Sequence, residues 1–202
     1  MKILITGTTG YIAKRLALQL LEEDHELVCC VRDMNRIPHE LEEHPQCTFI
    51  KVDFLKPETA KIPENIDAAY YLIHSMATSS DDFETLEEQC AQNFKSLVAN
   101  TSCNQVIYLS GIVNDDALSK HLKSRLQVEN TLKSTAYALT TFRAGIIVGS
   151  GSASFEIIRD IVEKLPVMVT PKWLNTKTQQ IAIRDILAYL ERDNYKKEMY
   201  TK

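Results

Sequence analysis

Short apolar runs alternate along the chain with longer segments whose apolar residues recur at helical spacing. The run at residues 2–6 has the length of a buried strand, and residues 11–21 place their apolar side chains three or four positions apart. The same alternation predicts strands at residues 26–31, 48–52, 68–73, 105–109, 138–142 and 179–183. It predicts the intervening helices at residues 81–100, 118–133, 152–165 and 184–191.

Strands that alternate with helices form βαβ units, and such units build a parallel sheet with helices on both faces. No internal repeat, low-complexity tract or linker divides the chain. We therefore predict an α/β fold with a doubly wound parallel sheet, in a single domain of residues 1–202.

Composition excludes several classes of partner and site. The net charge of −4 gives no reason to expect nucleic acid or an anionic membrane as a partner. No apolar run approaches the roughly 20 residues that span a bilayer, and the N-terminus lacks the features of a secretory signal, so we expect a cytoplasmic protein. Five cysteines without a Cys-x-x-Cys pair, and histidines without ligand spacing, indicate neither a disulfide framework nor a metal site.

A glycine-bearing turn follows the first predicted strand and opens the first predicted helix, with the sequence Gly7-Thr8-Thr9-Gly10-Tyr11-Ile12-Ala13. The first glycine permits the sharp turn, the second lets the backbone approach a pyrophosphate, and the small third residue lets helix and strand pack closely. Free amides at the helix N-terminus then bind the anion. The context favours a nicotinamide dinucleotide site at residues 7–12 over a turn that only joins strand to helix.

With Thr6, this spacing resembles the Thr-Gly-x-x-Gly-x-x-Gly pattern of the extended and atypical short-chain dehydrogenase/reductase families, with Ala13 in place of the last glycine. One atypical subgroup, which includes NAD-dependent epimerase/dehydratase-like and NmrA-like proteins, is similar over nearly the whole chain. The similar segments are residues 69–76, Asn93, Ser110-Gly111, Ser124-Arg125, Glu129, residues 142–145 and residues 176–178. The resemblance implies a Rossmann fold with strand order 3-2-1-4-5-6.

The end of the second strand distinguishes NAD from NADP, because an acidic side chain there binds the ribose hydroxyls whereas arginine pairs with a 2′-phosphate. Here Arg32 stands at the tip and Arg36 follows one helical turn later, so two guanidiniums can surround one phosphate. The pattern resembles that of NADP-binding atypical members of the family. Asp33 is the counter-evidence, and an alternative is that Arg32 and Asp33 pair on the surface. We predict NADP rather than NAD.

Further cofactor contacts are expected at the carboxyl ends of the other strands, where ligands of open α/β sheets bind. The family resemblance implies that Asp53, after the third strand, accepts from the adenine amino group, although a loop or capping aspartate is an equal alternative. The expected contacts on the nicotinamide side are Leu72, Ile73, His74, Ser75 and Asn93. For His74 the alternative is a histidine hydrogen-bonded at the strand end.

The catalytic helix departs from the family pattern. Active members carry a serine and a Tyr-x-x-x-Lys pair, whose four-residue step puts both side chains on one helix face. Here Ser110 fills the serine position, while His121 and Arg125 stand where tyrosine and lysine are expected. His121 can act as an acid or base near neutrality, or it is an exposed residue without a chemical role. Arg125 can hold a ribose but cannot release a proton.

Two functions therefore remain open. The first is an NADP-dependent oxidoreductase or epimerase-like enzyme acting on a small molecule, and a homodimer is possible. The second is a non-catalytic NADP(H)-binding redox sensor or an assembly or regulatory subunit, which the missing Tyr-Lys pair favours. Extended family members run beyond 202 residues, so residues 150–202 are expected to form an abbreviated substrate-side segment, whether the chain is naturally compact or truncated.

Overall fold

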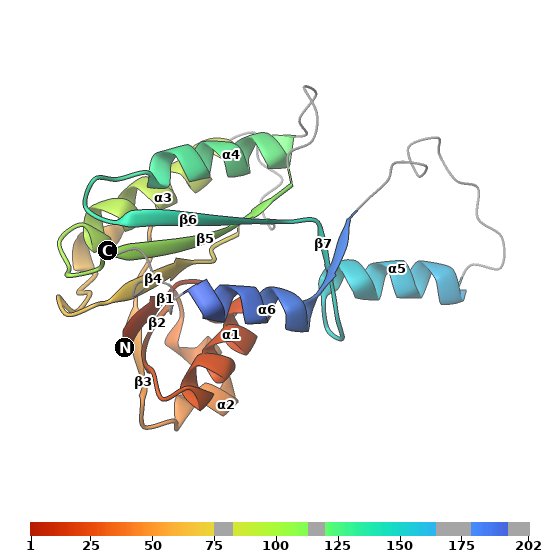
Figure 1. Cartoon of the computed structure of the whole chain (residues 1–202), viewed down its shortest axis with the longest axis horizontal. Coiled ribbons are helices and arrows are strands. Elements are labelled where there is room, and N and C mark those ends of the chain that lie inside the picture. The colour runs from red at the N-terminus through yellow and green to blue at the C-terminus, as the bar shows by residue number, and fades with distance from the viewer. Residues whose placement is uncertain (75–82, 113–119, 165–178, 194–202) are drawn as a thin grey trace, which may run out of the picture.

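Six parallel strands form the central sheet of the protein (Figure 1). The structure is a computed structural model that describes residues 1–74, 83–112, 120–164 and 179–193. The sheet order β3-β2-β1-β4-β5-β6 confirms the predicted doubly wound topology. The strands are β1 (Lys2–Ile5), β2 (Glu26–Val31), β3 (Cys47–Lys51), β4 (Ala68–Tyr71), β5 (Gln105–Gly111) and β6 (Ala138–Ala144).

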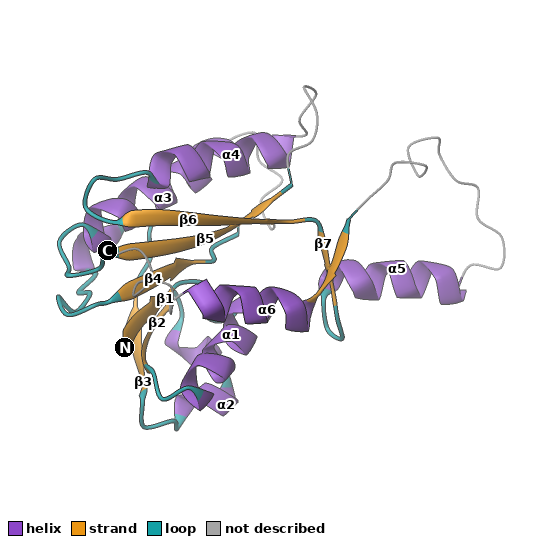
Figure 2. Ribbon diagram, viewed as in Figure 1, coloured by secondary structure: helices purple, strands orange, loops and turns teal. Residues whose placement is uncertain are grey.

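Helices cover both faces of this sheet (Figure 2). One face carries α1 (Tyr11–Glu22), the short α2 (His39–Glu42) and α6 (Ile183–Asp193), while the other carries α3 (Phe83–Val98) and α4 (Lys120–Leu132). Two 3₁₀ turns, Met34–Arg36 and Pro57–Thr59, lie in the connections around β3. The short α2 was not predicted, because the polar stretch after β2 has too few apolar residues to show helical spacing.

Alternation along the strands divides the core between the two faces. Ile3 and Ile5 of β1 pack with Leu16 and Leu20 of α1, whereas Leu4 packs in the cluster that contains Phe94 of α3. All six side chains are fully buried. Burial on both faces explains why these strands form nearly continuous apolar runs in the sequence.

A second, two-stranded parallel sheet extends the fold beyond β6. It consists of β7 (Ile146–Val148) and β8 (Gln180–Ala182), and Ile147 lies in register with Ile181. Gly145 turns the chain between β6 and β7 so closely that a Cβ atom there would collide with the carbonyl oxygen of Gln179. The sequence pattern predicted β8 but not β7, because three residues directly after β6 read as a continuation of that strand.

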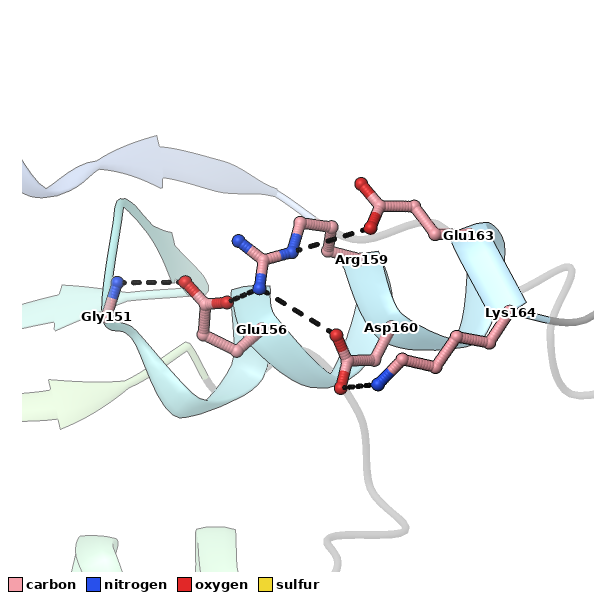
Figure 3. Close-up of polar contacts among 6 residues, drawn as sticks. All are labelled: Gly151, Glu156, Arg159, Asp160, Glu163 and Lys164. Atoms are coloured by element: carbon pink, nitrogen blue, oxygen red, sulfur yellow. Dashed lines mark hydrogen bonds and ion pairs between the residues drawn. The ribbon is translucent and has the colours of Figure 1, made fainter.

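Helix α5 (Ala153–Lys164) projects from the second sheet and has two distinct faces. One face carries a ladder of ion pairs, in which Arg159 contacts Glu156 and Glu163 while Lys164 contacts Asp160 at 2.8 Å (Figure 3). Glu156 also accepts from the amide of Gly151 at 3.0 Å. The other face exposes the aliphatic residues Ile157, Ile158, Ile161 and Val162.

No helix within the described ranges combines the length and the apolar character needed to cross a membrane.

Candidate functional site: a dinucleotide pocket

The glycine turn lies between β1 and α1, at the carboxyl edge of the sheet. Gly7 has a φ of 68°, and a Cβ atom on it would lie 2.7 Å from the carbonyl oxygen of Leu72. The amide of Gly10 closes the turn by donating to the carbonyl oxygen of Gly7 at 2.7 Å. Position 7 therefore requires glycine both for its left-handed backbone and for its close approach to the end of β4.

The first turn of α1 leaves its backbone amides free for an anion. Gly10, the N-cap residue just before the helix, is extended and supplies no side-chain hydrogen bond, and the first turn has no acidic residue. Thr8 does not reach these amides, because its hydroxyl donates to the carbonyl oxygen of Ile5 at 3.2 Å. The N-terminus of a helix with free amides and an aligned dipole is suited to a phosphate group.

A cavity of about 580 Å³ opens beside this helix N-terminus. That volume lies within the usual range for small-molecule and cofactor sites. The cavity brings together most of the residues that the sequence analysis singled out, from elements far apart in the chain. These residues are Gly7, Thr9, Gly10, Tyr11, Ile12, Arg32, Asp53, Leu72, Ile73, His74, Ser110 and Arg125.

One end of the cavity is marked by charged residues that follow β2. Arg32 lines the cavity and is exposed to solvent. Asp33 makes no described ion pair with Arg32, because it caps the next 3₁₀ turn by accepting from the backbone and side-chain amides of Asn35 at 3.0 and 3.1 Å. Arg36, in the same turn, is exposed and lies outside the cavity lining. The guanidinium of Arg32 is thus the charged group that this segment presents to a ligand.

Asp53 has a structural contact and also lines the cavity. One of its carboxylate oxygens accepts from the amide of Leu55 at 3.0 Å, which shapes the turn after β3. A carboxylate has further acceptor positions beyond the one used here. Asp53 can therefore shape the loop and contact a ligand at the same time.

The tips of β4 and β5 form the opposite end of the cavity. Thr6 ties β4 to β1, since its hydroxyl donates to the carbonyl oxygen of Tyr70 at 3.1 Å and accepts from the amide of Leu72 at 2.9 Å. Just beyond, burial and the positive charge of Arg125 lower the pKa of His74 to about 3. The imidazole of His74 is thus neutral at pH 7 and can exchange hydrogen bonds without carrying charge.

Ser110 contributes a buried hydroxyl that lies beside the phenol of Tyr108 and makes no hydrogen bond of regular geometry with a described residue. The side chain is 2% exposed and lines the cavity. Buried polar groups are almost always satisfied in folded proteins, so such a hydroxyl at a cavity wall is available to a ligand. At the end of the cavity formed by the tips of β4 and β5, Ser110 and the neutral His74 are polar groups and Arg125 carries a positive charge.

The sequence of residues 3–140 matches the NAD dependent epimerase/dehydratase family. The chain belongs to this family. No curated protein sequence matches the chain significantly.

Solved structures of the same fold include sugar-nucleotide epimerases and a reductase. UDP-glucuronic acid 4-epimerase from Bacillus cereus, in complex with NAD, superposes with a TM-score of 0.74 at 21% identity, over 95% of this chain and 73% of the epimerase. Yeast methylglyoxal/isovaleraldehyde reductase, complexed with NADPH, superposes with a TM-score of 0.77 at 13% identity, over 98% of this chain and 75% of the reductase. These similarities show that the chain shares their fold.

Several predicted site residues of this epimerase/dehydratase family member lie away from the cavity lining. Thr8 and Arg36 have been described above. His121 is exposed on the first turn of α4, and Asn93 of α3 donates to the carbonyl oxygen of Phe54 at 2.7 Å, which anchors the turn after β3. Ser75 lies outside the described residues.

Two further polar side chains have structural partners. Arg143, at the end of β6, forms a two-point contact with Glu129 of α4, with distances of 2.7 and 3.3 Å. Tyr108 is buried, and its hydroxyl donates to the carbonyl oxygen of Arg125 at 3.3 Å. Burial raises the pKa of Tyr108 to about 12, although Ser110 and Arg125 oppose this shift. Its phenol therefore stays protonated at neutral pH.

The sequence analysis missed the apolar wall of the cavity. Leu86 and Cys90 come from one face of α3, four residues apart, while Ala144–Ile147 enter through the turn into β7. Other lining residues that the sequence analysis did not single out are Cys30, Val31, Val52, Phe54, Leu55 and Leu109. Ala13 of the glycine turn also lines the cavity, as do Ser152 and Ala153 of the expected substrate-side segment. Apolar residues at strand tips have the same sequence signature as core residues, so only the fold separates them.

In the described part of the chain, no group of three or more His, Cys, Asp or Glu residues could hold a metal ion.

Proposed function

We propose that this protein binds NADP(H) in the cavity beside the glycine turn. The observation that carries the proposal is the uncapped N-terminus of α1, which opens onto a cavity with Arg32 at one end and Ser110 at the other. Two features of the chain fit a dinucleotide there. Gly7 leaves room where a Cβ atom would crowd Leu72, and the buried Ser110 hydroxyl makes no hydrogen bond of regular geometry with a described residue.

The cavity residues divide into three groups that match the parts of a dinucleotide. The free amides in the first turn of α1 would hold the pyrophosphate. Arg32 would pair with a 2′-phosphate, and Asp53 would accept from the adenine amino group. Leu72, Ile73 and His74 would border the nicotinamide. Arg32 supports NADP over NAD because its side chain lines the cavity, whereas Asp33 lies outside the cavity lining and is held in the next turn by Asn35.

We further propose an oxidoreductase or epimerase-like reaction on a small molecule that carries a hydroxyl or carbonyl group. A bound nicotinamide supplies or accepts a hydride in such chemistry. Ser110 would hydrogen-bond the reacting oxygen, and the fixed positive charge of Arg125 would stabilise negative charge on it. His121 would exchange the proton that accompanies hydride transfer. The epimerases and the reductase that share the fold, with NAD or NADPH bound, support this assignment of reaction class.

The second candidate is a non-catalytic NADP(H)-binding sensor or regulatory subunit. Two observations favour it over an enzyme. His121 is exposed and lies outside the cavity lining, and Arg125 cannot release a proton at ordinary pH.

Titration with NADPH and with NADH, followed by nicotinamide fluorescence, tests the binding proposal. We expect NADPH to bind more tightly than NADH, and binding of neither would contradict the proposal. Single-turnover oxidation of bound NADPH with a panel of carbonyl compounds then separates the enzyme from the sensor. If turnover is found, an unchanged rate in His121→Ala would remove His121 from the mechanism, whereas Ser110→Ala should slow it.

A cytosolic location is part of the same proposal. All five cysteines are free thiols, as is usual in a reducing compartment. Fractionation of cells that express the tagged protein would test this location.

A further inference from the structure

Cys29 and Cys47 form a pair of thiols in direct contact on neighbouring strands. Their Sγ atoms lie 3.5 Å apart, with Cys29 in β2 and Cys47 at the first position of β3. Cys29 is completely buried, whereas Cys47 is partly exposed. Cys47 is therefore the more accessible residue of the pair, and its sulfur is in contact with the sulfur of Cys29.

The contact gives the two thiols different acidities. The hydrogen bond from Cys29 lowers the pKa of Cys47, because it stabilises the Cys47 thiolate. The same hydrogen bond, together with burial, raises the pKa of Cys29. Thiolate character and exposure, which determine how readily a cysteine is oxidised, thus coincide at Cys47.

The other three cysteines lack this combination. Burial raises the pKa of Cys30 and of Cys90, the latter to about 11. Cys103 is also buried, and its thiol donates to the carbonyl oxygen of Gln105 at 3.2 Å. Oxidation should therefore begin at Cys47.

We propose that Cys29 and Cys47 are a redox modification site, at which a hydroperoxide forms a reversible disulfide that weakens dinucleotide binding. The second part of this proposal rests on the proposed NADP(H) function, whereas disulfide formation does not.

The chemistry proceeds in two steps. The Cys47 thiolate attacks one peroxide oxygen, the O–O bond breaks, and Cys47 becomes a sulfenic acid while the other oxygen leaves as hydroxide or alkoxide. Cys29 then loses its proton and attacks the Cys47 sulfur, which forms the S–S bond and releases water. With hydrogen peroxide as oxidant, two thiols and one peroxide give one disulfide and two waters. A dithiol reductant reverses the change by thiol–disulfide exchange.

The strand register makes this disulfide strained. Cys47 lies opposite Leu27, and Cys29 lies opposite Phe49, so the two cysteines are offset by two residues. In a regular parallel ladder such a diagonal pair has Cα atoms about 8 Å apart, beyond the roughly 7 Å that a relaxed disulfide spans. Closing the bond must therefore pull the start of β3 along β2. Strained disulfides are easily reduced, which suits a reversible modification.

The same displacement links the thiol pair to the cavity. Residues that follow directly from the two strands, Arg32 after β2 and Asp53 after β3, line its adenosine end. The side chain of Thr8, in the glycine turn, also lies next to the Cys29 sulfur and opposes the rise in the pKa of Cys29. A shift of β3 against β2 changes the relative placement of Arg32 and Asp53, and so should weaken a ligand that contacts both.

The first experiment measures the disulfide itself. Purified protein is treated with hydrogen peroxide, remaining thiols are alkylated, and digested peptides are analysed by mass spectrometry with and without dithiothreitol. We expect a reducible Cys29–Cys47 linkage, which should also form in Cys103→Ala. Cys47→Ser should form no linkage, and Cys29→Ala should stop at a Cys47 sulfenic acid that a 1,3-dione traps. No linkage, or a linkage between other cysteines, would overturn the proposal.

The second experiment measures NADPH affinity before oxidation, after oxidation and after reduction. We expect oxidation to weaken NADPH binding about threefold or more, a change of about 0.7 kcal/mol, and dithiothreitol to restore it. Because linkage is reciprocal, saturating NADPH should disfavour the disulfide by the same factor in a glutathione redox buffer. A disulfide that leaves NADPH affinity unchanged would overturn the link to the cavity. If the reduced protein binds no NADPH, the proposed function fails while the linkage result still decides the modification site.

Discussion

The carboxylate of Asp33 accepts a hydrogen bond from the backbone amide of Asn35 at 3.0 Å and a second from its side-chain amide at 3.1 Å. Asp33 is held in the 3₁₀ turn at Met34–Arg36, while Arg32 lines the cavity. The sequence Arg32-Asp33 left NAD and NADP as alternatives, and the position of Arg32 at the cavity supports the proposed preference for NADP.

Replacement of Arg32 should therefore discriminate between the two cofactors. We expect Arg32→Ala to weaken NADPH binding about tenfold to a hundredfold, because one charge-assisted contact with phosphate is lost, and to change NADH binding little. Fluorescence titration of both cofactors measures the ratio. Arg159→Ala, which removes an equal charge from the exposed face of α5, is the matched control and should change neither affinity. Equal losses for NADPH and NADH would refute the 2′-phosphate assignment.

Two glycines with positive φ offer a test of the turn. Gly7 has a φ of 68° and stands against Leu72, whereas Gly151 has a φ of 79° with its nearest neighbours at ordinary contact distance. Alanine at either position meets the left-handed backbone penalty of about 1 kcal/mol. Gly7→Ala must in addition push the turn away from β4. We therefore expect this substitution to lower the free energy of unfolding by about 2 kcal/mol or more and to abolish NADPH binding.

Urea denaturation and NADPH titration of both variants measure these effects. Gly151→Ala should lose only the backbone penalty and keep its NADPH affinity. If both variants bind NADPH like the wild type, the close approach of Gly7 to Leu72 has no role in the site.

The sequence predicts the main sheet well because its inner strands β1, β2, β4 and β5 are buried apolar runs followed by a turn or helix. The edge strands β3 and β6 are only partly buried, but they also form short runs between turns and helices. The glycine turn was recognisable because its spacing and its place between strand and helix are both local. Tertiary contacts account for what the sequence could not show. The exposure of His121 outside the cavity lining depends on how α4 packs, and Asn93 is engaged by Phe54, a partner 39 residues away.

The ion pair between Arg143 and Glu129 lies outside the cavity lining, so we expect its loss to lower stability and to leave NADPH binding unchanged. Glu129 is buried and Arg143 half-exposed, and the two make two contacts between α4 and β6. We expect Glu129→Ala to lower the free energy of unfolding by about 1 kcal/mol, since it leaves the guanidinium without this partner. Arg159→Ala, in the exposed ladder of Figure 3, should change stability by less than about 0.5 kcal/mol. Chemical denaturation measures both, and a larger loss for Arg159→Ala would contradict this ranking.

His74 should make stability fall in mild acid. Burial and the charge of Arg125 lower its folded pKa to about 3, whereas the unfolded chain titrates near 6.5, so between these values only the unfolded state binds the proton. The contribution of His74 is therefore complete above about pH 6.5 and is lost as pH falls towards 3. We expect the stability advantage of wild type over His74→Gln to shrink by about 2 kcal/mol between pH 7 and pH 5, in urea denaturation without cofactor. The exposed His39 supplies the control, because His39→Gln should follow the wild-type curve. A His74→Gln curve parallel to wild type across this range would show that the imidazole is not held neutral by its surroundings.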